Sequence, residues 1–169
     1  MLDFLFRRLT AEPKRGAALF DAVSRVAREP HWYVEGKVPD TLDGRFAVLA
    51  TVTALVLVRL ERDGEQGDAV SVALTERFIE IMEAEHRELG QGDPTLGKTV
   101  RKLVGSLARR NELWRSAVKE VAWERASQES LYRNEVSGDA LKHSTGALRR
   151  LWSALEKSAL TEIAEGKLR

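Results

Sequence analysis

The chain has 169 residues, with 27 Lys and Arg against 26 Asp and Glu, and it has no cysteine. This length is typical of one domain. The lack of cysteine excludes disulfides, thiolate metal sites, iron-sulfur clusters and cysteine nucleophiles from the chain. Because the charges nearly balance, the whole molecule lacks the positive field expected of a DNA-binding protein, and any electrostatic partner has to meet a local patch.

The first residues do not have the pattern of a secretion signal. Asp3 stands where a signal peptide carries positive charge, and Arg7 and Arg8 interrupt the apolar residues early. The segment Leu2–Leu9 combines apolar and basic residues, which suits a membrane surface, although so short a segment binds weakly by itself. Docking on the body of the protein is the other interpretation. We expect residues 1–13 to form a mobile N-terminal segment.

Residues 28–45 contain most of the chain's irregular sequence. Pro30, Gly36, Pro39 and Gly44 all fall within them, so the segment cannot be one regular helix. We predict a long irregular loop rich in aromatic residues. Such loops are uncommon in compact domains, where they are usually functional or held down by their own side chains.

Phe46–Val58 is the most apolar run, and Arg45 and Arg59 close it. Spanning a bilayer takes about 20 apolar residues, so this run predicts a buried element and not a membrane span. Phe46–Leu60 is apolar on every side, which is typical of a central helix surrounded by others. Its valines and threonines leave a buried strand open, but its length favours a helix.

The rest of the chain indicates further helices. Residues 62–68 predict a polar turn, with Asp68 as the N-cap of an amphipathic helix over 72–89. Residues 100–122 space their apolar side chains by threes and fours, which predicts one long helix, or two with a break near Gly105. A third amphipathic helix should begin at 139 and close the chain. The patterns predict an all-α fold, one compact multi-helix domain over residues 1–169.

Three tryptophans lie in these helical segments. Trp114 and Trp152 fall on the apolar stripes of their helices, so we expect them in the core. Trp123 lies off the stripe, and we interpret it as a candidate contact residue. His86 falls near the apolar face of its helix, where a hydrogen-bonded structural histidine is commoner than a metal ligand.

The motif GDPTLGKT, which begins at Gly92, satisfies the pattern of a phosphate-binding loop. Such a loop needs a buried strand before it and a helix after it. A helix after it is credible, since Asp93 can cap it and Pro94 suits its first position. A helix, not a strand, is predicted before it, so we expect Gly90 and Gly92 to end that helix in left-handed conformation. Lys98 then becomes a solvated residue, and a nucleotide hydrolase is the least favoured hypothesis.

Charge is unevenly distributed between two neighbouring helices. Residues 76–93 are acidic, and the helix that follows has a basic face. That face could meet ribosomal RNA or anionic lipid. Alternatively, the acidic and basic helices neutralise each other or present solvated faces, which is the commoner outcome. The basic-face candidates are Lys98, Arg101, Lys102, Arg109 and Arg110.

No other pattern indicates enzyme chemistry. The three histidines are scattered, and no pair has metal-ligand spacing with a carboxylate partner. No nucleophile elbow accompanies the serines. We expect no catalytic residues, no metal, no cofactor and no small-molecule substrate.

Four blocks of sequence, in the same order along the chain, resemble the ubiquinol-cytochrome c chaperone family. HWYVEGKVPDTLDGRF at 31–46, with the apolar run behind it, resembles the signature region of the family. LGQGDPTLGKTVRKLV at 89–104 is similar to its second block, a Gly-x-Gly-Asp turn before a basic helix. LYRNE at 131–135 and ALTEIAEGKLR at 159–169 are similar to later pieces. The order of all four is far more specific than an eight-residue pattern.

The resemblance implies an all-helical assembly factor for ubiquinol-cytochrome c reductase, the respiratory complex III. It implies that the client is newly made cytochrome b, that the protein is not an enzyme, and that this is the bacterial, cytoplasmic form. Peripheral attachment to the cytoplasmic face of the inner membrane is a finer hypothesis. A helical module that binds the ribosome, RNA or a membrane surface is the alternative function.

A chaperone of a membrane protein needs exposed apolar or aromatic surface. The irregular loop is the best candidate for it, with Asp40, Asp43 and Arg45 fixing the shape of the loop through hydrogen bonds and charge pairs. The alternative is that the aromatic residues pack inward as anchors of the loop. The candidate client-binding residues are Trp32, Tyr33, Val34, Val38, Pro39, Asp40, Asp43, Arg45 and Phe46.

Overall fold

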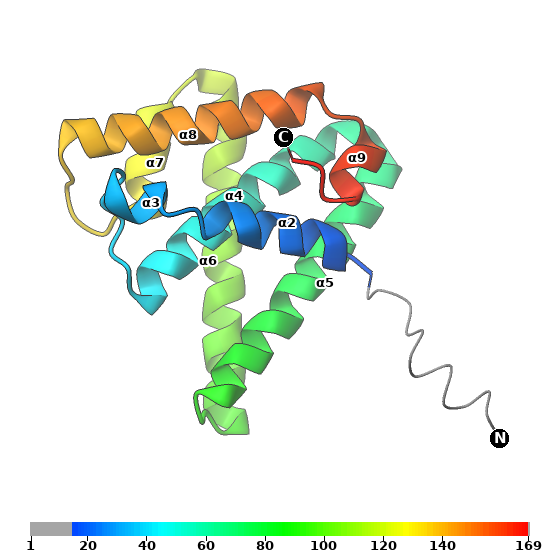
Figure 1. Cartoon of the computed structure of the whole chain (residues 1–169). Helices are drawn as coiled ribbons and strands as arrows, with labels where there is room; N and C mark the ends of the chain where they lie inside the picture. The colour runs from blue at the N-terminus through cyan, green and yellow to red at the C-terminus, as the bar shows by residue number, and fades with distance from the viewer. Residues whose placement is uncertain (1–14, 169) are drawn as a thin grey trace.

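The computed structural model describes residues 15–168, which form helices and no β-strand (Figure 1). They make a single compact helical domain, so the predicted all-α class is confirmed. The predictions for residues 1–13, namely mobility, contact with a membrane surface and docking on the body, lie outside the described residues. The elements are α2 (Ala17–Ala27), α3 (His31–Val34), α4 (Leu42–Leu60), the 3-10 helix η1 (Glu61–Asp63), α5 (Gly64–Glu88), α6 (Asp93–Glu120), α7 (Trp123–Leu131), α8 (Gly138–Lys157) and α9 (Leu160–Ala164).

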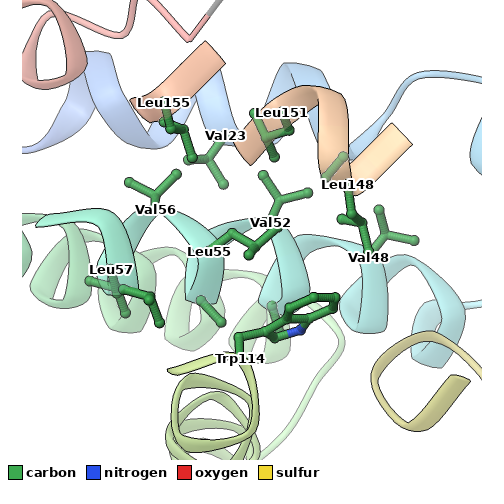
Figure 2. Close-up of a cluster of buried hydrophobic side chains, with 14 of the residues drawn as sticks. Val23, Val48, Val52, Leu55, Val56, Leu57, Trp114, Leu148, Leu151 and Leu155 are labelled. Atoms are coloured by element: carbon green, nitrogen blue, oxygen red, sulfur yellow. The ribbon is translucent and has the colours of Figure 1, made fainter. Parts of the chain in front are cut away.

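Helix α4 lies at the centre of the domain, as its all-round apolar sequence predicts. Every residue from Ala50 to Leu60 is buried. Helices α2 and α8 cover one side of α4, and Trp114 of α6 packs on the other (Figure 2). The buried hydroxyls of Thr51 and Thr53 each donate a hydrogen bond, 2.7 Å long, to the carbonyl oxygen four residues earlier. The helix is thereby enclosed without leaving these polar groups unpaired. Among residues 15–168, no helix is long and apolar enough to cross a bilayer.

The polar turn predicted at 62–68, with Asp68 as a cap, is wrong. The chain turns earlier, in η1, and α5 already begins at Gly64 and contains Asp68. Gly64 has a φ of 56°, in the left-handed region that glycine adopts without strain, so this residue makes the turn. Gly67 lets the new helix pack closely, because a Cβ there would lie 2.0 Å from the carbonyl oxygen of Leu60.

Helix α6 is one continuous helix without a break at Gly105, which decides between the two predicted alternatives. Its N-cap is Gly92 and its first residue is Asp93, so the predicted cap at Asp93 is wrong. Gly90 has the predicted left-handed conformation, with a φ of 83°. The same prediction for Gly92 is wrong, because its backbone is extended, with a φ of −75°. Because helix α5 and not a strand precedes this turn, the phosphate-loop motif lacks its structural setting. Lys98 is exposed, as predicted.

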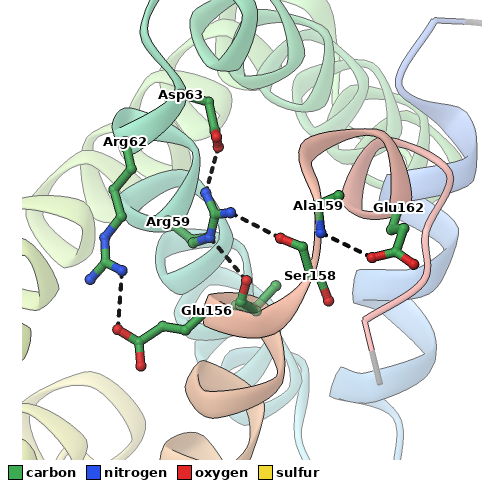
Figure 3. A network of polar contacts seen from close by, with 8 residues as sticks. Arg59, Arg62, Asp63, Glu156, Ser158, Ala159 and Glu162 are labelled. Carbon is green, nitrogen blue, oxygen red and sulfur yellow. Dashed lines mark hydrogen bonds and ion pairs between the residues drawn. The ribbon is translucent and has the colours of Figure 1, made fainter.

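The predicted closing helix is two helices, with a break at Ser158 that Arg59 of α4 holds. The buried guanidinium of Arg59 donates hydrogen bonds to the carbonyl oxygens of Leu155, at 2.9 Å, and Ser158, at 3.0 Å (Figure 3). It also pairs with Asp63. A cation at the C-terminal end of α8 satisfies its last carbonyl groups, which explains why the helix stops there although its apolar spacing continues to Ile163.

Trp123 is buried, so its interpretation as a contact residue is wrong. The apolar series predicted to 122 ends early, because Val121 takes a φ of 57° and is exposed. A new helix, α7, therefore starts at Trp123 with its own orientation. The ring of Trp123 lies 5.3 Å from that of Trp114 and 6.4 Å from that of Trp152, between centroids. Trp114 and Trp152 are buried, as predicted.

Candidate client-binding groove

The predicted irregular loop contains one short helix, α3, and a buried anchor. The indole nitrogen of Trp32 donates a hydrogen bond to the carbonyl oxygen of Val26, at 2.8 Å, and the side chain is 1% exposed. Val38 is 2% exposed. These two residues hold the loop on the body, so they pack inward and form no surface for a partner. Pro39 is exposed on the outside of the loop.

Most of the other candidate residues lie at a groove of about 920 Å³. Four helices form this groove: α2, α3, the start of α4 and the last turns of α5, with Leu103 of α6 below them. Its floor consists of buried or half-buried apolar side chains. Six of the nine candidate residues line it, namely Tyr33, Val34, Asp40, Asp43, Arg45 and Phe46. The apolar members of the lining are Phe20, Ala27, Pro30, Tyr33, Val34, Leu42, Phe46, Leu49, Ile81, Met82, Leu89 and Leu103.

Exposed apolar side chains concentrate at the rim of this groove. Val34 is 58% exposed, Leu42 70% and Leu89 60%. Within residues 15–168, only two other large apolar side chains are exposed, Val72 and Val121, and neither lines the groove. Single exposed apolar residues are ordinary, but several around one apolar hollow mark an interaction site. The groove is therefore the best candidate surface for a protein partner.

Sequence reasoning missed Leu42 and Leu89 as surface residues. Leu42 falls within the predicted loop, and Leu89 is the last residue of the amphipathic helix predicted over 72–89. In the structure Leu42 is the first residue of α4, and Leu89 follows the last residue of α5. Thr41 was the available signal for Leu42, since its hydroxyl accepts a hydrogen bond from the Gly44 amide as an N-cap does.

The loop contains two exposed ion pairs and one close backbone contact. Arg45 and Asp40 form an ion pair at 2.6 Å, and this hydrogen bond lowers the pKa of the Asp40 carboxyl below its ordinary value. Asp43 pairs with Arg133 at 2.8 Å, which ties the start of α4 to the segment after α7. Gly44 is required, because a Cβ there would lie 1.8 Å from the carbonyl oxygen of Pro39. The expectation that Asp40, Asp43 and Arg45 form charge pairs agrees with these contacts.

The histidines are less scattered than they look in the sequence. Nδ1 of His31 lies 3.1 Å from Nε2 of His143, and Nε2 of His31 lies 3.1 Å from a carboxylate oxygen of Glu29. This chain of contacts links α3 to α8. The described residues contain no group of three or more His, Asp or Glu side chains placed to hold a metal ion. His86 bonds through Nδ1 to the carbonyl oxygen of Met82 at 2.8 Å, as expected of a structural histidine.

The predicted basic face is smaller than the sequence indicated. Arg110 is half-buried and donates a hydrogen bond to the carbonyl oxygen of Ser130 at 2.8 Å. Its guanidinium lies 5.9 Å from the centre of the Phe46 ring, and burial lowers its pKa to about 10. The group therefore supports the floor of the groove. The four remaining members are exposed and form no ion pair within residues 15–168; they are Lys98, Arg101, Lys102 and Arg109, called the basic stripe below.

The basic stripe lies on the long hairpin that α5 and α6 form, which extends away from the other helices (Figure 1). Arg101 and Lys102 follow Lys98 by three and four residues, and Arg109 follows Lys102 by seven. The four residues therefore share the solvent face of α6, opposite Val100 and Leu107. Since none of the four pairs with a described acidic residue of α5, the predicted mutual neutralisation does not occur through ion pairs. The stripe remains a solvated face or a binding face.

Comparison with known proteins agrees with this fold. Residues 34–169 match the model of the family described as ubiquinol-cytochrome C chaperone. The chain is similar to the crystal structure of the Cbp3 homolog from Brucella abortus, with a TM-score of 0.76 and 23% identity over 98% of this chain and 94% of that chain. No curated protein matches the chain. The family match covers most of the sequence, so the chain belongs to the ubiquinol-cytochrome c chaperone family.

Proposed function

We propose that the protein is a non-enzymatic assembly chaperone for ubiquinol-cytochrome c reductase, and that it holds newly made cytochrome b. Family membership supports the general role. The observation that carries the proposal is the groove, with three exposed apolar side chains around an apolar floor. A chaperone of a membrane protein has to cover apolar segments of an unfinished client, and it needs surface rather than reactive groups to do so.

The client lies in the groove by this proposal, with Val34, Leu42 and Leu89 in contact with it. Trp32 and Val38 act indirectly, since both are buried and hold the loop on the body of the protein. Two acidic residues at the groove are paired with cations, Asp40 with Arg45 and Asp43 with Arg133.

Deletion of the gene tests the general role. We expect a loss of assembled cytochrome b from the membranes during respiratory growth, measured from its haem spectrum. Complementation with Leu42→Asp should fail, and complementation with Val72→Asp should succeed, because both side chains are exposed but only Leu42 lines the groove. Unchanged complex levels in the deletion strain would sink the assembly role. Equal complementation by both variants would contradict only the claim that the client binds in the groove.

The basic stripe supports a second, subsidiary role. Four uncompensated cations on one helix face suit peripheral attachment to an anionic membrane surface, at about 1 kcal/mol for each Lys or Arg close to the lipid. Such attachment would place a cytoplasmic chaperone beside the membrane that receives its client. RNA is the rival partner of the same face, and its binding would show a steep dependence on salt.

A further inference from the structure

The two walls of the groove differ in their free charge. On the side of α3 and α4, Asp40 pairs with Arg45, and Asp43 pairs with Arg133. On the side of α5, Glu85 and Glu88 are exposed and form no ion pair within residues 15–168. One wall is therefore neutralised by its own contacts, and the other presents two free carboxylates.

The helix register places these carboxylates beside apolar surface. Ile81, Glu85 and Glu88 follow one another by four and three residues, so they share one flank of α5, and all three line the groove. Leu89 extends the same flank to the exposed rim. Arg28, at the end of α2, is a cation of the lining that has no ion pair in the described part of the chain. The free charge of the groove still favours a cationic ligand, with two carboxylates against one guanidinium.

An apolar floor with a free acidic wall fits a particular chemistry, which is an apolar segment with Lys or Arg next to it. Transmembrane helices carry this combination where they emerge on the cytoplasmic side, because basic residues are retained there. We propose that the groove binds the cytoplasmic end of an apolar transmembrane segment, with the flanking Lys or Arg residues of the client against Glu85 and Glu88. This inference rests on the proposed function, which supplies a membrane-protein client.

Three synthetic peptides test the inference in the full-length protein. Each consists of about twelve Leu and Ala residues, roughly three helical turns, with a fluorophore and the same Gly/Ser tail at one end. The other end carries Lys-Lys, Ser-Ser or Glu-Glu. We expect the Lys-Lys peptide to bind roughly tenfold more tightly than the Glu-Glu peptide in low salt, as a few exposed charge contacts would give. The preference should shrink as salt screens the charges.

A matched pair of double variants isolates the acidic wall. Glu85→Gln with Glu88→Gln should remove the preference between peptides while leaving the affinity for the Ser-Ser peptide unchanged. The control is Glu76→Gln with Glu83→Gln, which removes the same charge from the other flank of α5, outside the groove. The control should keep the wild-type preference, and thermal unfolding should be unchanged in both.

The outcomes separate the two proposals. Equal binding of the three peptides, or a preference that survives Glu85→Gln with Glu88→Gln, overturns the role of the acidic wall and leaves the groove intact. If the Ser-Ser peptide does not bind the wild type, or if it binds Leu42→Asp with the same affinity as the wild type, the assignment of the groove fails. The inference then fails with it.

Discussion

The two halves of helix α4 both carry large apolar side chains but have different surroundings. From Ala50 to Leu60 the helix is enclosed by α2, α6 and α8, and every side chain is buried (Figure 2). From Leu42 to Leu49 it is only partly covered, since Leu42 is exposed, and Phe46 and Leu49 are half-buried at the groove. The same kind of sequence therefore stabilises the fold in one half and offers surface to a partner in the other.

This difference teaches where stability and binding can be separated. Burial of an apolar side chain contributes about 25 cal/mol for each Å² removed from water, whichever partner covers it. In the covered half the protein itself supplies that partner. In the open half the contribution is available only when another molecule fills the groove. Substitutions in the covered half should consequently lower the free energy of unfolding, and substitutions in the open half should lower the affinity for a partner. The following variants test this difference.

The largest effect on stability is expected in the covered half, from Leu55→Ala. Leu55 is fully buried, and its truncation should lower the free energy of unfolding by about 3 kcal/mol, through lost burial and the cavity left behind. Urea denaturation measures this change. A loss below about 1 kcal/mol would show that the covered half is not the packed core.

The next effect is expected at the end of the covered half, from Arg59→Met. The methionine keeps the apolar stem but removes the guanidinium donor from the carbonyl oxygens of Leu155 and Ser158, and it leaves Asp63 without its partner. We expect a loss of about 2 kcal/mol in the free energy of unfolding. Arg62→Met is the control, because its ion pair with Glu156 is exposed and should contribute little.

In the open half, Leu42→Asp should lower the affinity for a partner without lowering stability. Its free energy of unfolding should stay within about 0.5 kcal/mol of the wild type, because the side chain is exposed. Its affinity for the Ser-Ser peptide should fall by at least about tenfold, since a charge would replace an apolar contact. Unfolding and fluorescence titrations on the same sample measure the two quantities. A variant that lost stability and kept affinity would contradict the comparison.

The smallest effect on the fold is expected from Lys98→Glu with Lys102→Glu in the basic stripe. Both side chains are exposed and unpaired within the described residues, so stability and peptide affinity should not change. Sedimentation with anionic lipid vesicles should show weaker binding, by about fivefold or more for each reversed charge. Lys142→Glu with Lys157→Glu is the matched control on α8. Unchanged vesicle binding, or salt-dependent binding to RNA instead, would exclude the membrane role.

The sequence predicted the parts of the fold that depend on local pattern. Phe46–Leu60 is apolar in every direction, and at this length the pattern favours a helix surrounded by others. Helix boundaries were harder. Nothing in the residues near Val121 signals a helix end, because neither glycine nor proline is present, and the register of Trp123 could not be read through that break. Asp68 failed as a cap because an earlier glycine already makes the turn.

The candidate site was predicted only in part, for a different reason. The loop residues Tyr33, Val34 and Phe46 share one sequence block, so their role as candidates could be inferred together. Leu89 lies far from them in the sequence and reaches the same groove only because α5 converges there with α3 and α4. The inward position of Trp32 depends on a hydrogen bond to the preceding helix, which the sequence does not reveal.

Site-specific photo-crosslinking in cells tests the central claim most directly. A photoreactive amino acid is placed at position 42 or 89, at the rim of the groove, and at position 72 as an exposed control on α5. The account predicts cross-links from positions 42 and 89 to newly made cytochrome b, and none from position 72. Cross-links to cytochrome b from position 72 alone, or from none of the three positions, would contradict it.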